Sequence, residues 1–125
     1  MLAAVAMAVL AFTTGDDGDD PVAVTTATTT ATQATGAQAG LAVWVAQGCA
    51  SCHTLAAANA HGELGPDLGT SLAGEPAASI RRSIVDPNAE AAEDYEAGMM
   101  PTDYGTRITK RDLDSLVAFL RASAR

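Results

Sequence analysis

The stretch QGCASCHTL, residues 47–55, contains both cysteines of this 125-residue chain. Cys49 and Cys52 are three positions apart, and His53, one of two histidines, directly follows them. Thiolate sulfur and imidazole nitrogen are strong metal ligands, and thiols also serve in disulfide and redox chemistry. Because the chain places its only two thiols within one turn, beside a histidine, this stretch is the candidate functional site.

Four kinds of site fit cysteines at this spacing. A structural disulfide would gain little, because closing so short a loop removes little chain entropy. A thioredoxin-like redox pair needs a preceding strand and a βαβ unit, and the sequence predicts neither. Zinc could bind Cys49, Cys52, His53 and His61, but the adjacent Cys52 and His53 make a poor tetrahedral pair. The fourth is covalent haem attachment, whose motif is Cys-x-x-Cys-His, and this is the interpretation that we favour.

In a haem site of this kind, the two thiols form thioethers with the vinyl groups of the porphyrin, and the adjacent histidine supplies one axial nitrogen. A methionine as the second axial ligand raises the redox potential relative to bis-histidine ligation. The segment AGMMPTDYG, residues 97–105, offers Met99 and Met100 in a loop bounded by glycine and proline. A ligating histidine usually donates its other ring N–H to an oxygen, and LGPDLG, residues 64–69, offers the Pro66 carbonyl.

The composition limits the partners and favours a cofactor. The net charge is −8, from fifteen acids and seven bases, so nucleic acid is disfavoured as a partner because its phosphate backbone is also negative. Only two Phe, two Tyr and one Trp are available for a core, and a domain this small buries only about 60–65 % of its unfolded surface. A bound cofactor would supply the apolar volume that the side chains lack.

Two segments precede the folded unit. Residues 1–12, MLAAVAMAVLAF, form an apolar run that is short for a membrane span but has the length of a signal-peptide core. No Lys or Arg precedes Arg81, so we interpret the run as a truncated signal peptide or membrane anchor. Residues 13–38 are rich in Thr, Ala and Asp without apolar periodicity, which predicts a flexible linker; within it VAVTT, residues 22–26, could form a short strand.

Residues 39–125 are predicted to form an all-α domain of short helices joined by long loops, without strands or internal repeats. A first helix over residues 38–47 would place Leu41, Trp44 and Val45 on one face. A second would run from about 76 to 85, and a third would begin after a capping-box pair, Thr109 and Asp112. The expected apolar stripes of the last two helices are Ile80 and Ile84, and Leu113, Leu116, Val117 and Leu120.

These features together resemble a class I (monohaem) cytochrome c over residues 41–120. The elements follow the order of that family: a helix with an aromatic residue, GCASCHTL, GPDLG, a Met-Pro loop and a closing helix with LVAFL. The segment SIVDPNAEAAEDYEAGMMPTDYG, residues 83–105, is also similar to cytochrome c domains fused to or associated with respiratory oxidases. The resemblance implies a small cytochrome c-like fold of three to five short helices and long loops around one covalently bound haem c.

The resemblance also implies roles for single residues. The implied haem-binding residues are Cys49 and Cys52 as thioethers, His53 as proximal ligand, the Pro66 carbonyl as acceptor from the His53 ring, and Met100 as distal ligand. Met99 is the alternative distal ligand, whereas Met100 is the methionine directly before a proline. The terminal helices are expected to pack together with Trp44 near Phe119. His61 is expected to be a solvated loop residue.

The implied function is one-electron transfer in an extracytoplasmic respiratory chain, at the periplasmic or outer face of the cytoplasmic membrane, rather than enzymatic catalysis. The implied partners are redox proteins, in particular a membrane respiratory complex, and the N-terminus could tether the domain. Two alternatives stay open: a tethered electron-entry subunit of a membrane oxidase or reductase complex, and a haem enzyme or sensor with an open sixth site. Lysine is scarce, so the basic docking face of mitochondrial members is not expected here.

Overall fold

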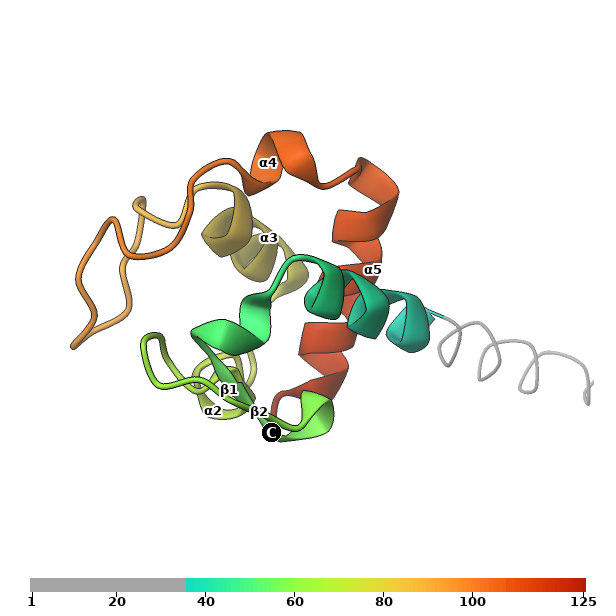
Figure 1. Cartoon of the computed structure of the whole chain (residues 1–125), viewed down its shortest axis with the longest axis horizontal. Helices are drawn as coiled ribbons and strands as arrows, with labels where there is room; N and C mark the ends of the chain where they lie inside the picture. Colours follow the sequence, from blue (N-terminus) through green and yellow to red (C-terminus); the bar gives the residue numbers. More distant parts are fainter. Residues whose placement is uncertain (1–35) are drawn as a thin grey trace, which may run out of the picture.

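The computed structural model describes residues 36–125, whose course is shown in Figure 1. The expected signal or anchor segment (1–12), the VAVTT segment and all but the end of the expected linker lie outside these residues. Residues 36–38, which were expected to belong to the linker, are helical. A helix over residues 36–46 comes first. The elements that follow are η1 (Cys49–Ser51), β1 (Thr54–Leu55), η2 (Ala56–Ala58), β2 (Ala60–His61), α2 (Leu68–Ser71), α3 (Ala77–Val85), α4 (Tyr104–Arg107) and α5 (Lys110–Ser123). The prediction of short helices joined by long loops is confirmed.

Helix 36–46 and α5 cross in contact with each other, as Figure 1 shows. Gly40 lies at the crossing, where a Cβ atom would collide with the Ser115 carbonyl oxygen and with Phe119 Cβ. One turn later, Trp44 is 1 % exposed, and its ring meets the Phe119 ring edge-on with centroids 6.4 Å apart. The predicted contact between Trp44 and Phe119 is therefore confirmed.

The prediction that Val45 shares this buried face is wrong, because its side chain is 68 % exposed. Successive helical residues are rotated by about 100°, and with Trp44 pointing into the core, Val45 turns outward. Val43, on the other side of Trp44, packs against the core instead.

α5 and α3 begin and pack much as the sequence predicts. Thr109 Oγ1 accepts a hydrogen bond from Asp112 N at 3.2 Å and donates one to the Asp112 carboxylate at 2.8 Å, which caps α5. Pro76 is the N-cap of α3, one position before the helix proper. An ion-pair network joins the two helices, since Asp114 contacts both Arg81 of α3 and Lys110. The buried stripes are Ile80 and Ile84 on α3, and Leu113, Leu116, Val117, Phe119 and Leu120 on α5.

The prediction that the domain has no strands is wrong at one place. β1 and β2 pair antiparallel, with Thr54 opposite His61 and Leu55 opposite Ala60. Asn59 makes the reversal with a left-handed backbone, φ 48°, a conformation that asparagine tolerates better than most residues. Strands of two residues are too short for an alternating pattern to appear in the sequence. His61 is exposed as predicted, but it belongs to this hairpin rather than to a loop.

The connection from α3 to α4, residues 86–103, carries six acids and no base, and we call it the acidic loop. It extends away from the helices on the left of Figure 1. Short-range hydrogen bonds hold it, the longest-reaching being that from Gly98 N to Asn88 Oδ1 at 2.7 Å. Asp94, at φ 69°, supplies a second left-handed turn. The loop therefore has a defined path although it has no helix or strand of its own.

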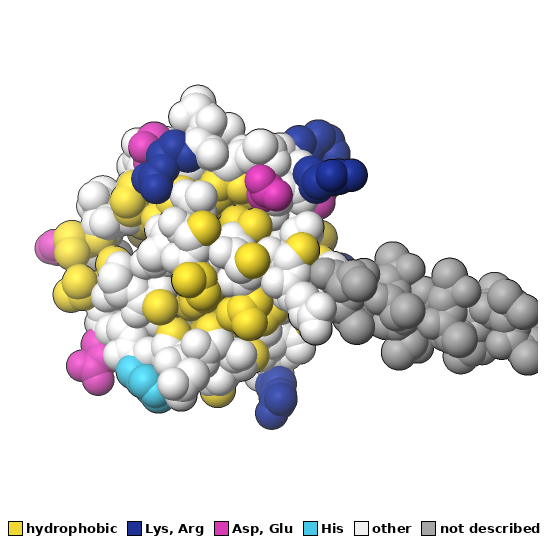
Figure 2. All heavy atoms as spheres, turned by 45° about the vertical axis from the view of Figure 1, so that its right-hand side comes forward, with side chains coloured by type: hydrophobic (Ala, Val, Ile, Leu, Met, Phe, Trp, Pro, Cys, Tyr) yellow, Lys and Arg dark blue, Asp and Glu magenta, His cyan; other side chains and the backbone are white. Residues whose placement is uncertain are grey.

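One apolar core joins these elements, with contributions from helix 36–46, the hairpin, α3, α4 and α5. Hydrophobic side chains also reach the surface: Figure 2 shows them over the middle of one face, with charged side chains toward its edges. Among residues 36–125, no helix combines the length and the apolar character that crossing a membrane would require.

Candidate functional site

The Cys-x-x-Cys-His segment forms one tight turn after helix 36–46. Gly48 follows the end of that helix in a left-handed conformation, φ 70°, which glycine adopts without strain. η1 follows, and His53 N donates to the Cys49 carbonyl at 3.1 Å. The turn brings Cys49, Cys52 and His53 to the wall of one cavity.

The His53 ring is held in one orientation. Its Nδ1 lies 3.0 Å from the Pro66 carbonyl oxygen, which is the contact that the sequence predicted. Because a carbonyl oxygen can only accept, Nδ1 carries the proton and Nε2 keeps a free lone pair. Gly65 lies against the ring, and a Cβ there would be 2.6 Å from His53 Cε1. The ring also has Trp44 as a neighbour, with centroids 6.5 Å apart.

The cavity has a volume of about 690 Å³ and is lined by residues from most parts of the fold. Helix 36–46 contributes Trp44 at the inner end, whereas α3 and the acidic loop line the cavity extensively. His61 does not line it. All the predicted site residues do: Cys49, Cys52, His53, Pro66 and Met100, together with the alternative Met99.

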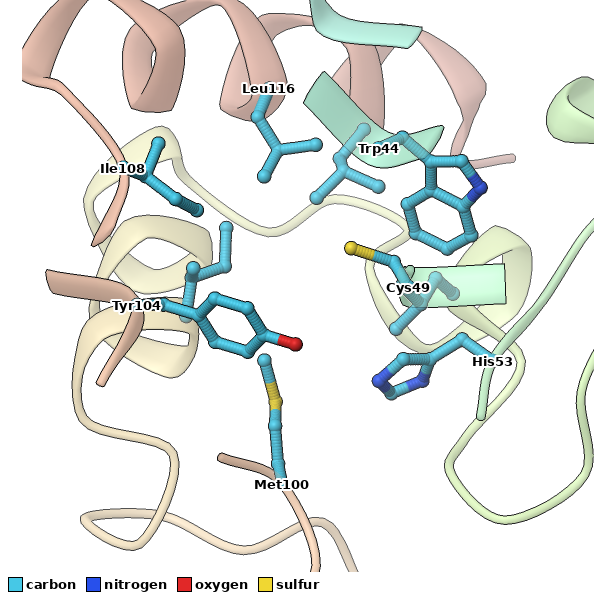
Figure 3. Close-up of a pocket in the computed structure, with 10 residues that line it drawn as sticks. Trp44, Cys49, His53, Met100, Tyr104, Ile108 and Leu116 are labelled. Carbon is cyan, nitrogen blue, oxygen red and sulfur yellow. The ribbon is translucent and has the colours of Figure 1, made fainter. Parts of the chain in front are cut away.

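Figure 3 shows the inner end of this cavity. His53 and Met100 lie on opposite sides of it, and the Tyr104 hydroxyl points into the space between the side chains. Met100 is partly buried and packs against the core, whereas Met99 is 58 % exposed. This difference favours Met100 as the sulfur facing the imidazole. The remaining lining of the inner end is apolar and comprises Trp44, Leu68, Ile84, Ile108, Leu116 and Leu120.

Burial also changes the acid–base behaviour of two groups here. It raises the pKa of the Cys49 thiol to about 11, an effect that a backbone hydrogen bond to the sulfur only partly offsets. This thiol is therefore protonated and weakly nucleophilic at neutral pH. Burial, reinforced by the neighbouring Cys49, also raises the pKa of Tyr104. Its phenol is therefore an uncharged hydrogen-bond donor in the cavity.

The other interpretations of the cysteine cluster gain no support. The thiols of Cys49 and Cys52 are free, so no disulfide closes the turn. Within the part of the chain that the structure describes, no three His, Cys, Asp or Glu side chains come together as a metal site, so the zinc site with His61 is not assembled. The two-residue strands that follow the cysteines are antiparallel and do not form a βαβ unit.

The residues present fit a covalently attached haem on structural grounds. The cavity combines two free thiols, an oriented imidazole, a thioether sulfur on the opposite side and an apolar inner end. The family model described as Cytochrome c matches residues 37–124. The chain belongs to the cytochrome c family. Comparisons with curated proteins and with solved structures gave no match.

As a member of the cytochrome c family, the protein is a haem-based electron carrier whose cofactor is haem c, attached covalently. Its partners are redox proteins, and domains of this family are typically extracytoplasmic. The fold agrees with the class I type, since short helices enclose one cavity between the motif turn and the methionine-bearing loop.

The sequence analysis missed three residues of the site. Gly65 and Tyr104 lie within the LGPDLG and AGMMPTDYG segments, but neither residue was assigned a role of its own. Arg107 also lines the cavity; its guanidinium lies 5.1 Å from the centre of the Tyr104 ring, pairs with Asp103 at 3.3 Å and donates to Gln47 at 3.2 Å. Tyr104 and Arg107 closely follow the Met-Pro pair in the sequence, and this closeness is the signal that could have indicated these two residues.

Proposed function

We propose that this cytochrome c is a low-spin, one-electron carrier with His53 and Met100 as axial ligands and with thioethers from Cys49 and Cys52. The observation that carries the proposal is the 3.0 Å hydrogen bond between His53 Nδ1 and the Pro66 carbonyl. It leaves Nε2 as the one ring nitrogen free to bind a metal. The partly buried Met100 on the opposite side supports a six-coordinate site.

When bound, haem c supplies the one-electron couple between Fe(III) and Fe(II). The chain's own residues set the conditions for it. The Pro66 carbonyl accepts from Nδ1–H, which fixes the tautomer and orientation of the His53 ring and raises the basicity of Nε2. The apolar inner end excludes water and disfavours the more highly charged oxidised state, which raises the potential. No proton transfer by the protein is required, so these residues position and insulate rather than react.

The methionine assignment is tested by two matched variants, Met100→Ala and Met99→Ala. Only Met100→Ala is expected to abolish the absorption band characteristic of methionine–iron ligation and to lower the potential. Optical spectra and redox titration of the mature protein measure both properties. An effect confined to Met99→Ala would reverse the assignment, and a high-spin ferric spectrum of the parent protein at neutral pH would instead indicate an enzyme or sensor with an open sixth site.

We also propose that the folded domain works outside the cytoplasm in a respiratory chain, with the residues from 13 up to the start of helix 36–46 as a linker and residues 1–12 as a signal or anchor. The typical location of the family supports this placement. A flexible linker of about 25 residues spans about 25–30 Å, which suits a tethered domain at a membrane complex. Fractionation after expression separates two roles: recovery in washed membranes supports the tethered electron-entry subunit, and recovery in soluble extract supports a diffusing carrier.

A further inference from the structure

Exposed apolar side chains border the mouth of the haem cavity on two sides. Leu64, Tyr95 and Met99 all line the cavity, and in the protein without haem they are 62 %, 38 % and 58 % exposed, of which a bound haem would cover the cavity-facing part. Leu64 directly precedes the Gly65–Pro66 turn, which contacts His53, whereas Tyr95 and Met99 belong to the acidic loop. We call these three residues the apolar rim. Large apolar side chains gathered around one opening are characteristic of an interaction surface.

The charges around the same mouth are predominantly negative. The charged side chains that line the cavity are Glu75, Glu90, Glu96 and Arg107. Arg107 pairs with Asp103, so its charge is compensated. Within residues 36–125, the other acids of the acidic loop have no ion-pair partner; they are Asp86, Glu90, Glu93, Asp94 and Glu96. Haem c carries negatively charged propionate groups and would not neutralise these acids, so they face solvent or a partner.

We propose that the apolar rim and the acidic loop together form the docking surface for a redox partner protein that presents a basic face around an apolar centre. The inference rests on the proposed electron-carrier function and specifies the chemistry of its partner. A second copy of this chain would bring two acidic loops together, and an anionic membrane surface would repel the loop. Opposite charge would steer the encounter, and contact at the rim would exclude water where one electron passes between the two cofactors.

The test uses the haem-loaded, reduced full-length protein and two small oxidants of opposite charge. The probes are the apolar cation tris(phenanthroline)cobalt(III) and the anion hexacyanoferrate(III), each of which accepts one electron. Oxidation by the cation is expected to slow on the order of tenfold from low to high salt, while oxidation by the anion speeds up. A lysine-rich mitochondrial-type cytochrome c in its oxidised form then serves as a protein-sized cationic probe. The rate at which it accepts an electron is expected to fall with salt in the same way.

A matched pair of variants assigns the effect to the acidic loop. Glu90→Gln, Glu93→Gln and Glu96→Gln together remove three negative charges from the loop and should abolish most of the salt dependence with both cationic probes. The control adds the same three units of charge at exposed alanines that do not line the cavity, as Ala39→Lys, Ala118→Lys and Ala122→Lys. This control should retain most of the dependence.

Two results would overturn the docking surface: rates with the cationic probes that do not change with salt, or equal losses in the loop variant and in the control. Both leave the electron-carrier function standing, provided that the haem spectrum and a reversible one-electron titration are normal. Loss of that titration in the parent protein would count against the function itself, so the two failures are distinguishable.

Discussion

At the scale of single residues, the orientation of His53 depends on neighbours that contribute no side-chain chemistry. The Pro66 carbonyl fixes the tautomer, and Gly65 leaves room for the ring to reach that carbonyl. The missing Cβ of Gly65 is therefore as much a part of the site as the donor atoms are.

Gly65→Ala should displace the His53 ring, because the new Cβ would be 2.6 Å from Cε1 and 2.8 Å from Nδ1. Overpacking of this kind typically costs about 1–3 kcal/mol of unfolding free energy. We expect lower stability in urea and an altered haem spectrum, because the hydrogen bond to Pro66 is strained. Gly69→Ala is the control, since its Cβ would meet only the Asp67 carboxylate at 3.1 Å. Equal effects of both substitutions would contradict this role for Gly65.

At this scale the sequence predicts which residues bind the cofactor better than it predicts how closely the neighbouring residues pack around them. Cys49, Cys52 and His53 can be identified because thioether attachment requires them at fixed spacing in the chain. Pro66 and Met100 lie far along the chain from His53; the Gly-Pro turn and the Met-Pro loop offered them as candidates, and the order of elements in the family assigned their roles. The steric role of Gly65 could not be predicted, because it depends on how two distant turns approach each other.

At the scale of elements, the crossing of helix 36–46 over α5 depends on Gly40. Gly40→Ala should lower the unfolding free energy by about 1–3 kcal/mol, because its Cβ would collide with the Ser115 carbonyl and Phe119 Cβ. The control is Gly36→Ala in the same helix, where a Cβ meets nothing within 4 Å. That variant should not lose stability, because its Cβ has room at the start of the helix. Urea unfolding of both variants measures the difference, and a stabilised Gly40→Ala protein would show that the crossing is looser than described.

The contact between α3 and α5 should depend on pH through Asp114. Hydrogen bonds from Lys110 and Arg81 hold the pKa of this exposed carboxyl below its ordinary value of 3.8. A lowered folded pKa means that the contribution to stability is present above 3.8 and is lost as pH falls through the folded pKa. Asp114→Asn should therefore be less stable than the parent at neutral pH, by an amount that shrinks in acid and in high salt. A deficit that is constant with pH would contradict this account.

Elements with a full amphipathic repeat could be predicted, and shorter ones could not. The stripe of α5 and its cap at Thr109 follow from spacing alone, as do Ile80 and Ile84 of α3. β1, β2, α2 and α4 have four residues or fewer, too few for either period to appear. They form because the cavity walls and the turns around Asn59 and Pro66 constrain them. These constraints come from residues distant in the sequence, so a local sequence pattern does not reveal them.

At the scale of the whole molecule, the cavity of about 690 Å³ makes the fold dependent on its cofactor. A Cys49→Ser, Cys52→Ser double variant cannot form thioethers and should lose haem on extraction with acidified acetone. We expect its thermal midpoint to fall by more than about 10 °C, since 1 kcal/mol corresponds to about 4–8 °C in a domain of this size. Circular dichroism measures the midpoint. Cys52→Ser, which keeps one thioether, should be intermediate; identical melting of all three proteins would exclude a stabilising role for haem.

The overall architecture was predictable because few large side chains and one compact motif leave a small domain little alternative to folding around a cofactor. The position of the acidic loop was not predictable from composition. Six acids spread over the loop 86–103 indicate a solvated segment. Only the folded chain places Glu90 and Glu96 at the mouth of the cavity together with Leu64.

The hydrogen bond from Gly98 N to Asn88 Oδ1 ties the two ends of the nine residues between them, 89–97, and has a consequence for how the protein can diversify. The tie holds the start of that stretch close to its end, just before Met99 and Met100. Insertions, deletions or charge swaps between the tied ends can then be absorbed without moving the methionine. Residues 89–97 could therefore be exchanged, in evolution or by engineering, so that the protein recognises another electron acceptor while its redox potential changes little.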